Sequence, residues 1–506
     1  MLILAINKSY LKMISQFNKI LLASIIFLIY PLYQLNGQGY EIYLKINGLQ
    51  NTDAILGHYL NKPLYPDDTV HLDINGEGKF TSDKLLPEGL YVIFLPPSKY
   101  FEFIIGNDQK FSITVDTTDL INSLKFTGSK ENEIFSDFQK YMIIKQEELK
   151  KYQDLINTTQ NKKDKESAKK KIEELGNERK EKILKINSEY PDLFVAAFLK
   201  STLEIDVPSS PKDKDGRIDS TWQYRYYRLH YFDNFNISDA RILRTPLYEE
   251  KIMNYLENIV PQIPDTLIKE VDFLIDKSRA DSSLFRFMLI TLFNHYGKSN
   301  IMGMDAVQVH IADKYYLSEA WWSDKKFIDD LKERISILKP LLLNQIAPDI
   351  QLLYVPSDHF KAAVNDTALK RYPHAGSLFY INKVEANFTV LIFWEATCSH
   401  CKKAVPEMYK IYEDTLKGMG VKIIAVSTLF GEDGKEKWVD FVNQHQLYDW
   451  INAWNPYDYK FKETYDVRTT PQIYILNHKK EIIGKRIGPG DVVGLINAYK
   501  MQFPDK

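Results

Sequence analysis

The stretch Phe393–Met408, FWEATCSHCKKAVPEM, contains both cysteines of a 506-residue chain, Cys398 and Cys401. The residues before it, FTVLIFW from Phe388, are β-branched and aromatic and predict a buried strand. The residues after it carry apolar side chains at helical spacing and predict a helix that starts at the cysteines. A C-x-x-C pair beside a strand–helix–strand pattern indicates thiol–disulfide chemistry.

The spacing of the two thiols assigns them different roles. The attacking species in disulfide exchange is the thiolate. At the N-terminus of a helix, Cys398 would face unpaired amide N–H groups and the positive end of the helix dipole, both of which lower its pKa. We therefore predict that Cys398 is the nucleophile, that Cys401, one turn later, resolves the mixed disulfide, and that a Cys398–Cys401 disulfide forms during the cycle.

His400 precedes the second cysteine and has two possible roles. It either adds positive charge or a hydrogen bond to the Cys398 sulfur, or it faces solvent with little influence. Further along, Thr470-Pro471 stands directly before the apolar strand QIYIL. Proline cannot donate in a central ladder, so Pro471 is either a trans proline at a sheet edge or a cis proline beside the cysteines. The order of the elements favours the cis peptide bond, with the Thr470 backbone free to pair with a substrate chain.

The C-terminal pattern has a specific resemblance. Its order is a strand, C-x-x-C at a helix start, a strand, a helix, a hairpin led by proline and a closing helix. The motifs that carry the resemblance are Ile346–Asp349, Phe393-Trp394, Cys398–Cys401, Pro406 and Thr470-Pro471. Residues 346–506 resemble the extracytoplasmic TlpA-like thiol–disulfide oxidoreductases, which have a thioredoxin fold.

This resemblance implies an enzyme that exchanges disulfides with protein substrates, with Trp394, Thr470 and Pro471 supporting the cysteines. It also implies an electron donor or acceptor of the cell envelope as a partner, and no cofactor or metal site. The chain departs from the family pattern at three positions. Ile392 stands where thioredoxins have a buried Asp, Ala404 where cytochrome-maturation members have Glu, and Thr397 where Trp is frequent.

The usual proton acceptor for the resolving thiol is therefore absent from both expected positions. Two carboxylates lie nearby in the sequence, Glu395 and Glu407. Either could substitute as the proton acceptor, but we expect both to be exposed surface residues, and a water could serve instead.

Upstream of residue 346 the sequence predicts two further domains. From residue 39 to 128, short runs with alternating apolar residues and regular turns predict an antiparallel β-sandwich. From residue 129 to 345 the apolar residues recur every three or four positions and predict an α-helical domain. It would open with a long helical hairpin whose charged, solvated turn lies in the polar stretch from Asn157 to Lys170.

The N-terminus resembles an export signal. Lys8, Lys12 and Lys19 precede an apolar run, Ile20–Tyr33, and a small polar segment follows. We predict a signal peptide over residues 1–38 and a location in the periplasm or cell envelope, with membrane attachment only if the signal stays uncleaved. The formal net charge of −2 gives no reason to expect nucleic-acid binding.

An alternative function of another class remains. The C-x-x-C pair could capture a soft metal such as Cu(I), or the upstream domains could form a partner-binding scaffold with secondary redox activity. Two thiolates make an incomplete zinc site, which requires four ligands.

Overall fold

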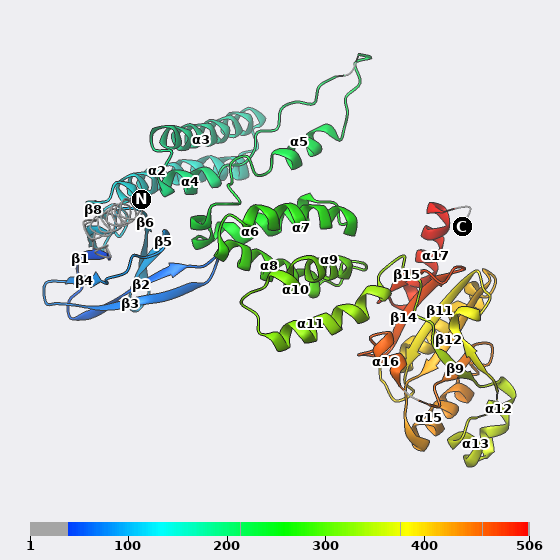
Figure 1. The fold of residues 1–506 in the computed structure, drawn as a ribbon. Helices are drawn as coiled ribbons and strands as arrows, with labels where there is room; N and C mark the ends of the chain where they lie inside the picture. The colour runs from blue at the N-terminus through cyan, green and yellow to red at the C-terminus, as the bar shows by residue number, and fades with distance from the viewer. Residues whose placement is uncertain (1–38, 213, 375, 458, 504–506) are drawn as a thin grey trace, which may run out of the picture. The chain divides into compact units, whose positions relative to one another are not determined.

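The computed structural model describes residues 39–503 except 213, 375 and 458 (Figure 1). The chain divides into two compact units between Ile259 and Val260. The predicted signal peptide, residues 1–38, lies outside the described part. Across residues 39–503, apart from the three gaps, no helix is both long enough and apolar enough to cross a membrane.

The first unit begins with two four-stranded sheets, with the orders β4-β1-β7-β8 and β3-β2-β5-β6. Their strands are β1 (Glu41–Asn47), β2 (Thr52–Tyr59), β3 (Leu64–Leu72), β4 (Glu77–Thr81), β5 (Gly89–Leu95), β6 (Lys99–Ile105), β7 (Lys110–Asp116) and β8 (Lys125–Thr127). The inward-facing residues of both sheets form one apolar core, as in a β-sandwich.

The alternating apolar residues of the sequence predicted this core correctly, because Ile42, Leu44 and Ile46 of β1 are all buried. The predicted β-sandwich is confirmed, with one strand pair that runs differently. β1 and β7 are parallel. No tight hairpin joins these two strands, so no turn requires them to be antiparallel.

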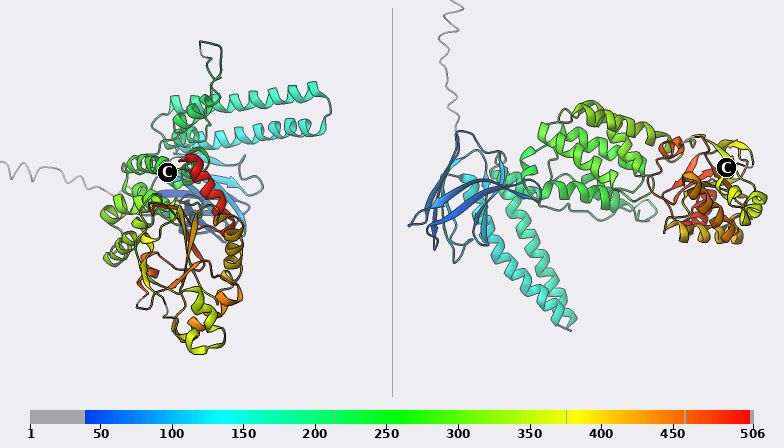
Figure 2. Two further views of the ribbon diagram at one scale, coloured as in Figure 1. Left: turned by 90° about the vertical axis from the view of Figure 1, so that its right-hand side faces the viewer. Right: turned by 90° about the horizontal axis from the view of Figure 1, so that it is seen from below.

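Two long helices follow, α2 (Lys130–Thr158) and α3 (Lys162–Glu189). They lie side by side as a hairpin, as the sequence predicted (Figures 1 and 2). The turn lies within the polar stretch 157–170 as predicted but is shorter than that stretch, because α3 already starts at Lys162 with Asn161 as its N-cap. The residues after Asn161 are rich in Lys, Glu and Ala and lack Gly and Pro, so they favour helix even though they are polar.

Buried hydrogen bonds join the sandwich to α2, and α2 to the helix that follows α3. The Asn132 side chain of α2 accepts from the Ile104 amide at 2.7 Å and donates to the Ile104 carbonyl at 2.7 Å. The Glu131 carboxylate accepts from the Val195 amide of α4 at 2.8 Å. The remaining α-helices of this unit are α4 (Phe194–Ser201), α5 (Trp222–His230) and α6 (Leu247–Asn254).

The second unit combines helices with a seven-stranded sheet of order β10-β9-β13-β12-β11-β14-β15. Its strands are β9 (Gln351–Tyr354), β10 (Leu378–Tyr380), β11 (Phe388–Trp394), β12 (Val421–Ser427), β13 (Ile451–Trp454), β14 (Gln472–Asn477) and β15 (Ile482–Lys485). Helices α7 (Pro264–Ser278), α8 (Ser282–Gly297), α9 (Asp305–Ile311), α10 (Leu317–Glu319) and α11 (Lys325–Leu338) precede the sheet.

The other helices accompany the strands. They are α12 (Ser357–Ala362), α13 (Thr367–Arg371), α14 (Cys401–Ile411), α15 (Gly431–Gln444), α16 (Lys460–Thr464) and α17 (Val492–Gln502). The central strand β11 is buried along its whole length. Val390, Ile392 and Trp394 enter the core on one face of the sheet, and Leu391 and Phe393 enter the core on the other. The continuous apolar run at Phe388 thus reflects burial on both faces.

The chain just before the sheet is bonded to its edge strand. The Asn344 amide donates to the Ile482 carbonyl at 2.8 Å, and the Ile482 amide donates to the Gln345 carbonyl at 2.8 Å. The Leu341 side chain belongs to the same apolar cluster as one face of the sheet. The end of the helical region is therefore packed onto β15, whose edge it covers.

Candidate active site

The two cysteines lie where β11 ends and α14 begins. Cys398 is partly exposed and Cys401 is fully buried, and both are free thiols. The helix begins at Cys401, and the Lys402 amide donates to the Cys398 carbonyl at 3.1 Å. The Cys398–Cys401 disulfide therefore stays a prediction.

The environment of Cys398 favours its thiolate. The Cys401 amide, in the first turn of α14, points at the Cys398 sulfur at 3.5 Å. Burial works to raise the pKa of Cys398, but hydrogen bonding from the Thr470 side chain and from the amides of Cys401 and His400 outweighs it. The pKa of Cys398 therefore lies below the ordinary value of a thiol, which makes this sulfur the better nucleophile.

Cys401 has the opposite character. Its sulfur accepts from the Glu395 amide at 3.5 Å, but burial dominates and raises the pKa of Cys401 to about 12. The structure thus separates a partly exposed thiol with a lowered pKa from a buried thiol with a raised pKa. The roles of nucleophile and resolver assigned from the C-x-x-C spacing stay predictions.

The loop before β14 faces the pair. β14 runs antiparallel to β11, with Gln472 opposite Phe393, and this register carries Thr470 to the cysteines. The Cys398 thiol donates to the Thr470 carbonyl at 3.2 Å. The Thr470–Pro471 peptide bond is cis. The Thr470 carbonyl thus lies directly beside the Cys398 sulfur.

His400 and Trp394 take different places. His400 is exposed at the N-cap of α14, and among the described residues its imidazole makes no hydrogen bond to either sulfur. This placement matches the solvent-facing alternative. Trp394 is fully buried and packs against Phe441, with ring centroids 5.1 Å apart. It supports the end of β11 from within the core.

Glu395 differs from the expectation of an exposed surface residue. Its side chain is 29% exposed, and its carboxylate accepts from the buried hydroxyl of Thr428 at 2.8 Å. The Lys462 ammonium lies 4.0 Å from the same oxygen. The parallel register of β11 and β12 brings Thr428 to this point, which the sequence alone did not indicate. Glu407 is exposed, as expected.

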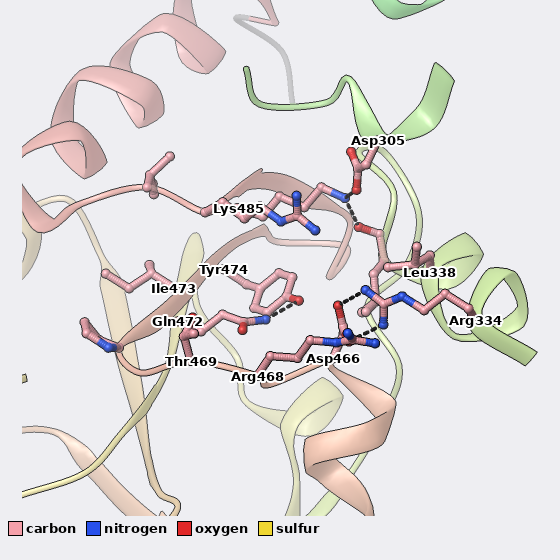
Figure 3. A pocket seen from close by; sticks show the side chains of 14 residues that line it. Asp305, Arg334, Leu338, Asp466, Arg468, Thr469, Gln472, Ile473, Tyr474 and Lys485 are labelled. Atoms are coloured by element: carbon pink, nitrogen blue, oxygen red, sulfur yellow. Dashed lines mark hydrogen bonds and ion pairs between the residues drawn. The ribbon is translucent and has the colours of Figure 1, made fainter. Parts of the chain in front are cut away.

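A pocket of about 460 Å³ opens on the same loop (Figure 3). Thr469 and Pro471, which flank Thr470, line it together with residues from α9, α11 and β15. Sequence analysis did not find this pocket. One signal was present, a lysine in the otherwise apolar strand that contains Lys485.

No metal-ligand cluster accompanies the cysteines. In the described part of the chain, no group of three or more His, Cys, Asp or Glu side chains is arranged to hold a metal ion.

Comparison with protein families agrees with this geometry, because a model described as thioredoxin-like matches residues 386–482. The C-terminal domain is thioredoxin-like. Two families described as domains of unknown function match the regions upstream of it, DUF4369 at residues 40–135 and DUF5106 at residues 157–336. The thioredoxin-like domain thus follows a β-rich and a helical region whose families have no assigned role.

Relatives of the thioredoxin-like domain bear oxidoreductase names. The sporulation thiol-disulfide oxidoreductase A of Bacillus subtilis is 32% identical over 101 residues, which is 20% of this chain. The match spans 59% of that relative's own length.

Solved structures are also similar. A thioredoxin-like protein from Bacteroides caccae is 15% identical, and the match covers 58% of this chain and 99% of that one, with a TM-score of 0.41. A domain of a possible thiol-disulfide isomerase from Cytophaga hutchinsonii is 26% identical, and the match covers 33% of this chain and 99% of that one, with a TM-score of 0.27.

Proposed function

We propose that this chain is a thiol–disulfide oxidoreductase that exchanges disulfides with protein substrates through Cys398 and Cys401. The observation that carries the proposal is the asymmetry of the two thiols. Cys398 is partly exposed, has a lowered pKa and lies 3.2 Å from the Thr470 carbonyl, whereas Cys401 is buried behind it with a raised pKa. Exchange requires one thiol that attacks and a second that stays protected until a mixed disulfide exists.

The reductive direction proceeds in two exchanges. The Cys398 thiolate attacks one sulfur of a substrate disulfide, the substrate S–S bond breaks, and the departing sulfur leaves as a thiolate that takes up a proton. Cys401 then loses its proton and attacks the Cys398 sulfur, which breaks the mixed disulfide and releases the second substrate thiol. Two electrons pass from the protein dithiol to the substrate disulfide, and the protein ends with a Cys398–Cys401 disulfide. The oxidative direction is the reverse.

The location outside the cytoplasm is part of the proposal. A basic and then apolar N-terminal segment supports export, and disulfides persist in oxidising compartments. In the periplasm or envelope, an electron donor or acceptor would return the pair to its starting state after each turnover.

Substrate turnover tests the proposal. Reduced protein should reduce insulin disulfides, Cys398→Ser should abolish this activity, and Cys401→Ser should accumulate a mixed disulfide with substrate. Activity that survives in Cys398→Ser would refute the role of that thiol. Stoichiometric Cu(I) binding without any turnover would favour metal capture instead.

A further inference from the structure

The pocket beside the Thr470 loop is formed by two parts of the second unit. The loop and β15 supply one wall, and the helical region before the sheet supplies the other, including Arg334 and Leu338 of α11. A thioredoxin-like domain limited to the sheet and its helices would lack this second wall. The pocket is thus a feature of this longer chain.

Most of the charge in the pocket is already paired. The buried Lys485 ammonium contacts Asp305 at 2.5 Å and donates to the Leu341 carbonyl at 2.6 Å. Arg334 forms a two-pronged ion pair with Asp466, and Arg468 donates to the same carboxylate at 2.8 Å (Figure 3). Both carboxylates of the pocket are therefore occupied by cations.

The cations outnumber the carboxylates. Arg334, Arg468, Lys485 and Arg486 line the pocket, against Asp305 and Asp466, so the lining carries a formal charge of +2. The exposed Arg486 makes no ion pair or side-chain hydrogen bond within the described residues. The Arg468 side chain is 68% exposed although it contacts Asp466. Two guanidinium groups are thus accessible to an incoming anion, and guanidinium matches a carboxylate well.

The pocket and the reactive sulfur share one loop. Thr470 contacts the Cys398 sulfur, and its two sequence neighbours, Thr469 and Pro471, line the pocket. A polypeptide held at the Thr470 backbone would pass directly from the sulfur to the cationic opening.

We propose that this pocket binds an acidic side chain of the polypeptide whose disulfide reacts at Cys398. The inference rests on the proposed function, because it names the class of substrate for the same site. The contacts would be guanidinium–carboxylate pairs with Arg486 and Arg468. The helical region would contribute by supplying the opposite wall of the pocket, whose Arg334 and Asp305 pair with Asp466 and Lys485.

Matched peptides test the proposal on the full chain. Each peptide has one internal disulfide and carries Glu, Gln or Lys at the positions beside one cysteine. The rate of conversion of the Cys398–Cys401 dithiol to its disulfide is followed by acid quenching, alkylation and mass measurement. At low salt the Glu peptide should react about three- to fivefold faster than the Gln peptide, as expected for partly exposed charge pairs, and the Lys peptide should be the slowest.

The ratio of the Glu rate to the Gln rate is the decisive quantity. It should fall toward one in Arg486→Gln and in Arg468→Gln. Lys437→Gln serves as the control, because it removes one exposed charge from α15, outside the pocket, and it should keep the wild-type ratio. Equal rates for the Glu and Gln peptides in the wild type, or an unchanged ratio in both arginine variants, would overturn the pocket assignment and leave the proposed function intact. If no peptide oxidises the dithiol, or if Cys398→Ser cleaves the peptide disulfides, followed as free peptide thiols, as fast as the wild type, the proposed function fails and this inference fails with it.

Discussion

The ion pair between Lys485 and Asp305 should hold the helical region on the thioredoxin-like domain. The two side chains are 4% and 8% exposed, and their charged atoms lie 2.5 Å apart. Asp305→Asn removes the counter-charge with almost no change of shape and leaves the lysine buried. Removal of one partner from a buried pair typically costs about 3–5 kcal/mol.

Deprotonation sets an upper limit on this cost. Lys485 can stay buried as a neutral amine, and moving a lysine from its ordinary pKa of about 10.4 to neutrality at pH 7 costs about 4.6 kcal/mol. We therefore expect Asp305→Asn to lower the free energy of unfolding of the second unit by about 3–4.5 kcal/mol at pH 7.

The loss should depend on pH. Burial already lowers the pKa of Lys485, and removal of Asp305 should lower it further. At pH values between the pKa of Lys485 in the folded variant and its higher pKa in the unfolded chain, the unfolded chain binds more protons than the folded one. The free energy of unfolding of the variant therefore rises with pH in this range. The difference from the wild type should shrink between pH 7 and pH 10.

Urea unfolding followed by tryptophan fluorescence measures this effect. Six of the seven tryptophans lie after Val260, so the signal reports mainly on the second unit. Asp449→Asn is the matched control, because its partner Lys417 is 49% exposed and water screens the pair, so this change should alter the stability far less than Asp305→Asn does. The double variant Asp305→Asn/Lys485→Met should recover part of the lost stability. A loss below about 1 kcal/mol that is constant from pH 7 to pH 10 would refute a buried, coupled pair.

Three further predictions concern the thiols and the two cores. Iodoacetamide should reach its half-maximal rate of modification of Cys398 at a lower pH than with an ordinary thiol, and Cys401 should stay unmodified in the folded protein below about pH 10. Equal pH profiles for the two cysteines in mass-resolved alkylation would contradict the asymmetry of the thiols. Ile424→Ala, at a fully buried position of β12, should destabilise the second unit by about 2–5 kcal/mol in the same urea assay, and a smaller loss would mean that the core refills the space. Gly106→Ala would place a Cβ 1.8 Å from the buried Glu131 carboxylate, so this variant should lower the free energy of unfolding of the first unit by about 1–3 kcal/mol. Unchanged hydrogen-exchange rates of the β6 amides would show that the Glu131 side chain can move aside.

Local pattern in the sequence predicted the thiol site well. The C-x-x-C pair, the buried strand before it and the apolar helix after it are consecutive in the chain, so periodicity and spacing report them directly. The short strand β13 and the helices α12 and α13 were not predicted, because elements of four to six residues carry too little periodic signal.

Local pattern did not show how short the helical turn is, because polarity and helix propensity disagree in the residues that follow it. Residues 162–170 are polar and form the start of α3, because Lys, Glu and Ala favour helix on a solvated face. The exposed role expected for Glu395 was wrong, because its burial depends on Thr428, which the register of the next strand brings to it.

By itself the sequence determined which residues can do chemistry. Its only two cysteines stand two residues apart at the start of a helix, and Thr470-Pro471 precedes a strand. The tertiary structure alone decided what surrounds them. The Thr470 carbonyl contacts the Cys398 sulfur although the two residues are 72 positions apart in the sequence, and Lys485 contacts Asp305 although these two are 180 positions apart. Such contacts depend on sheet register and on the packing of distant segments, and neither leaves a periodic signal in the residues that make them.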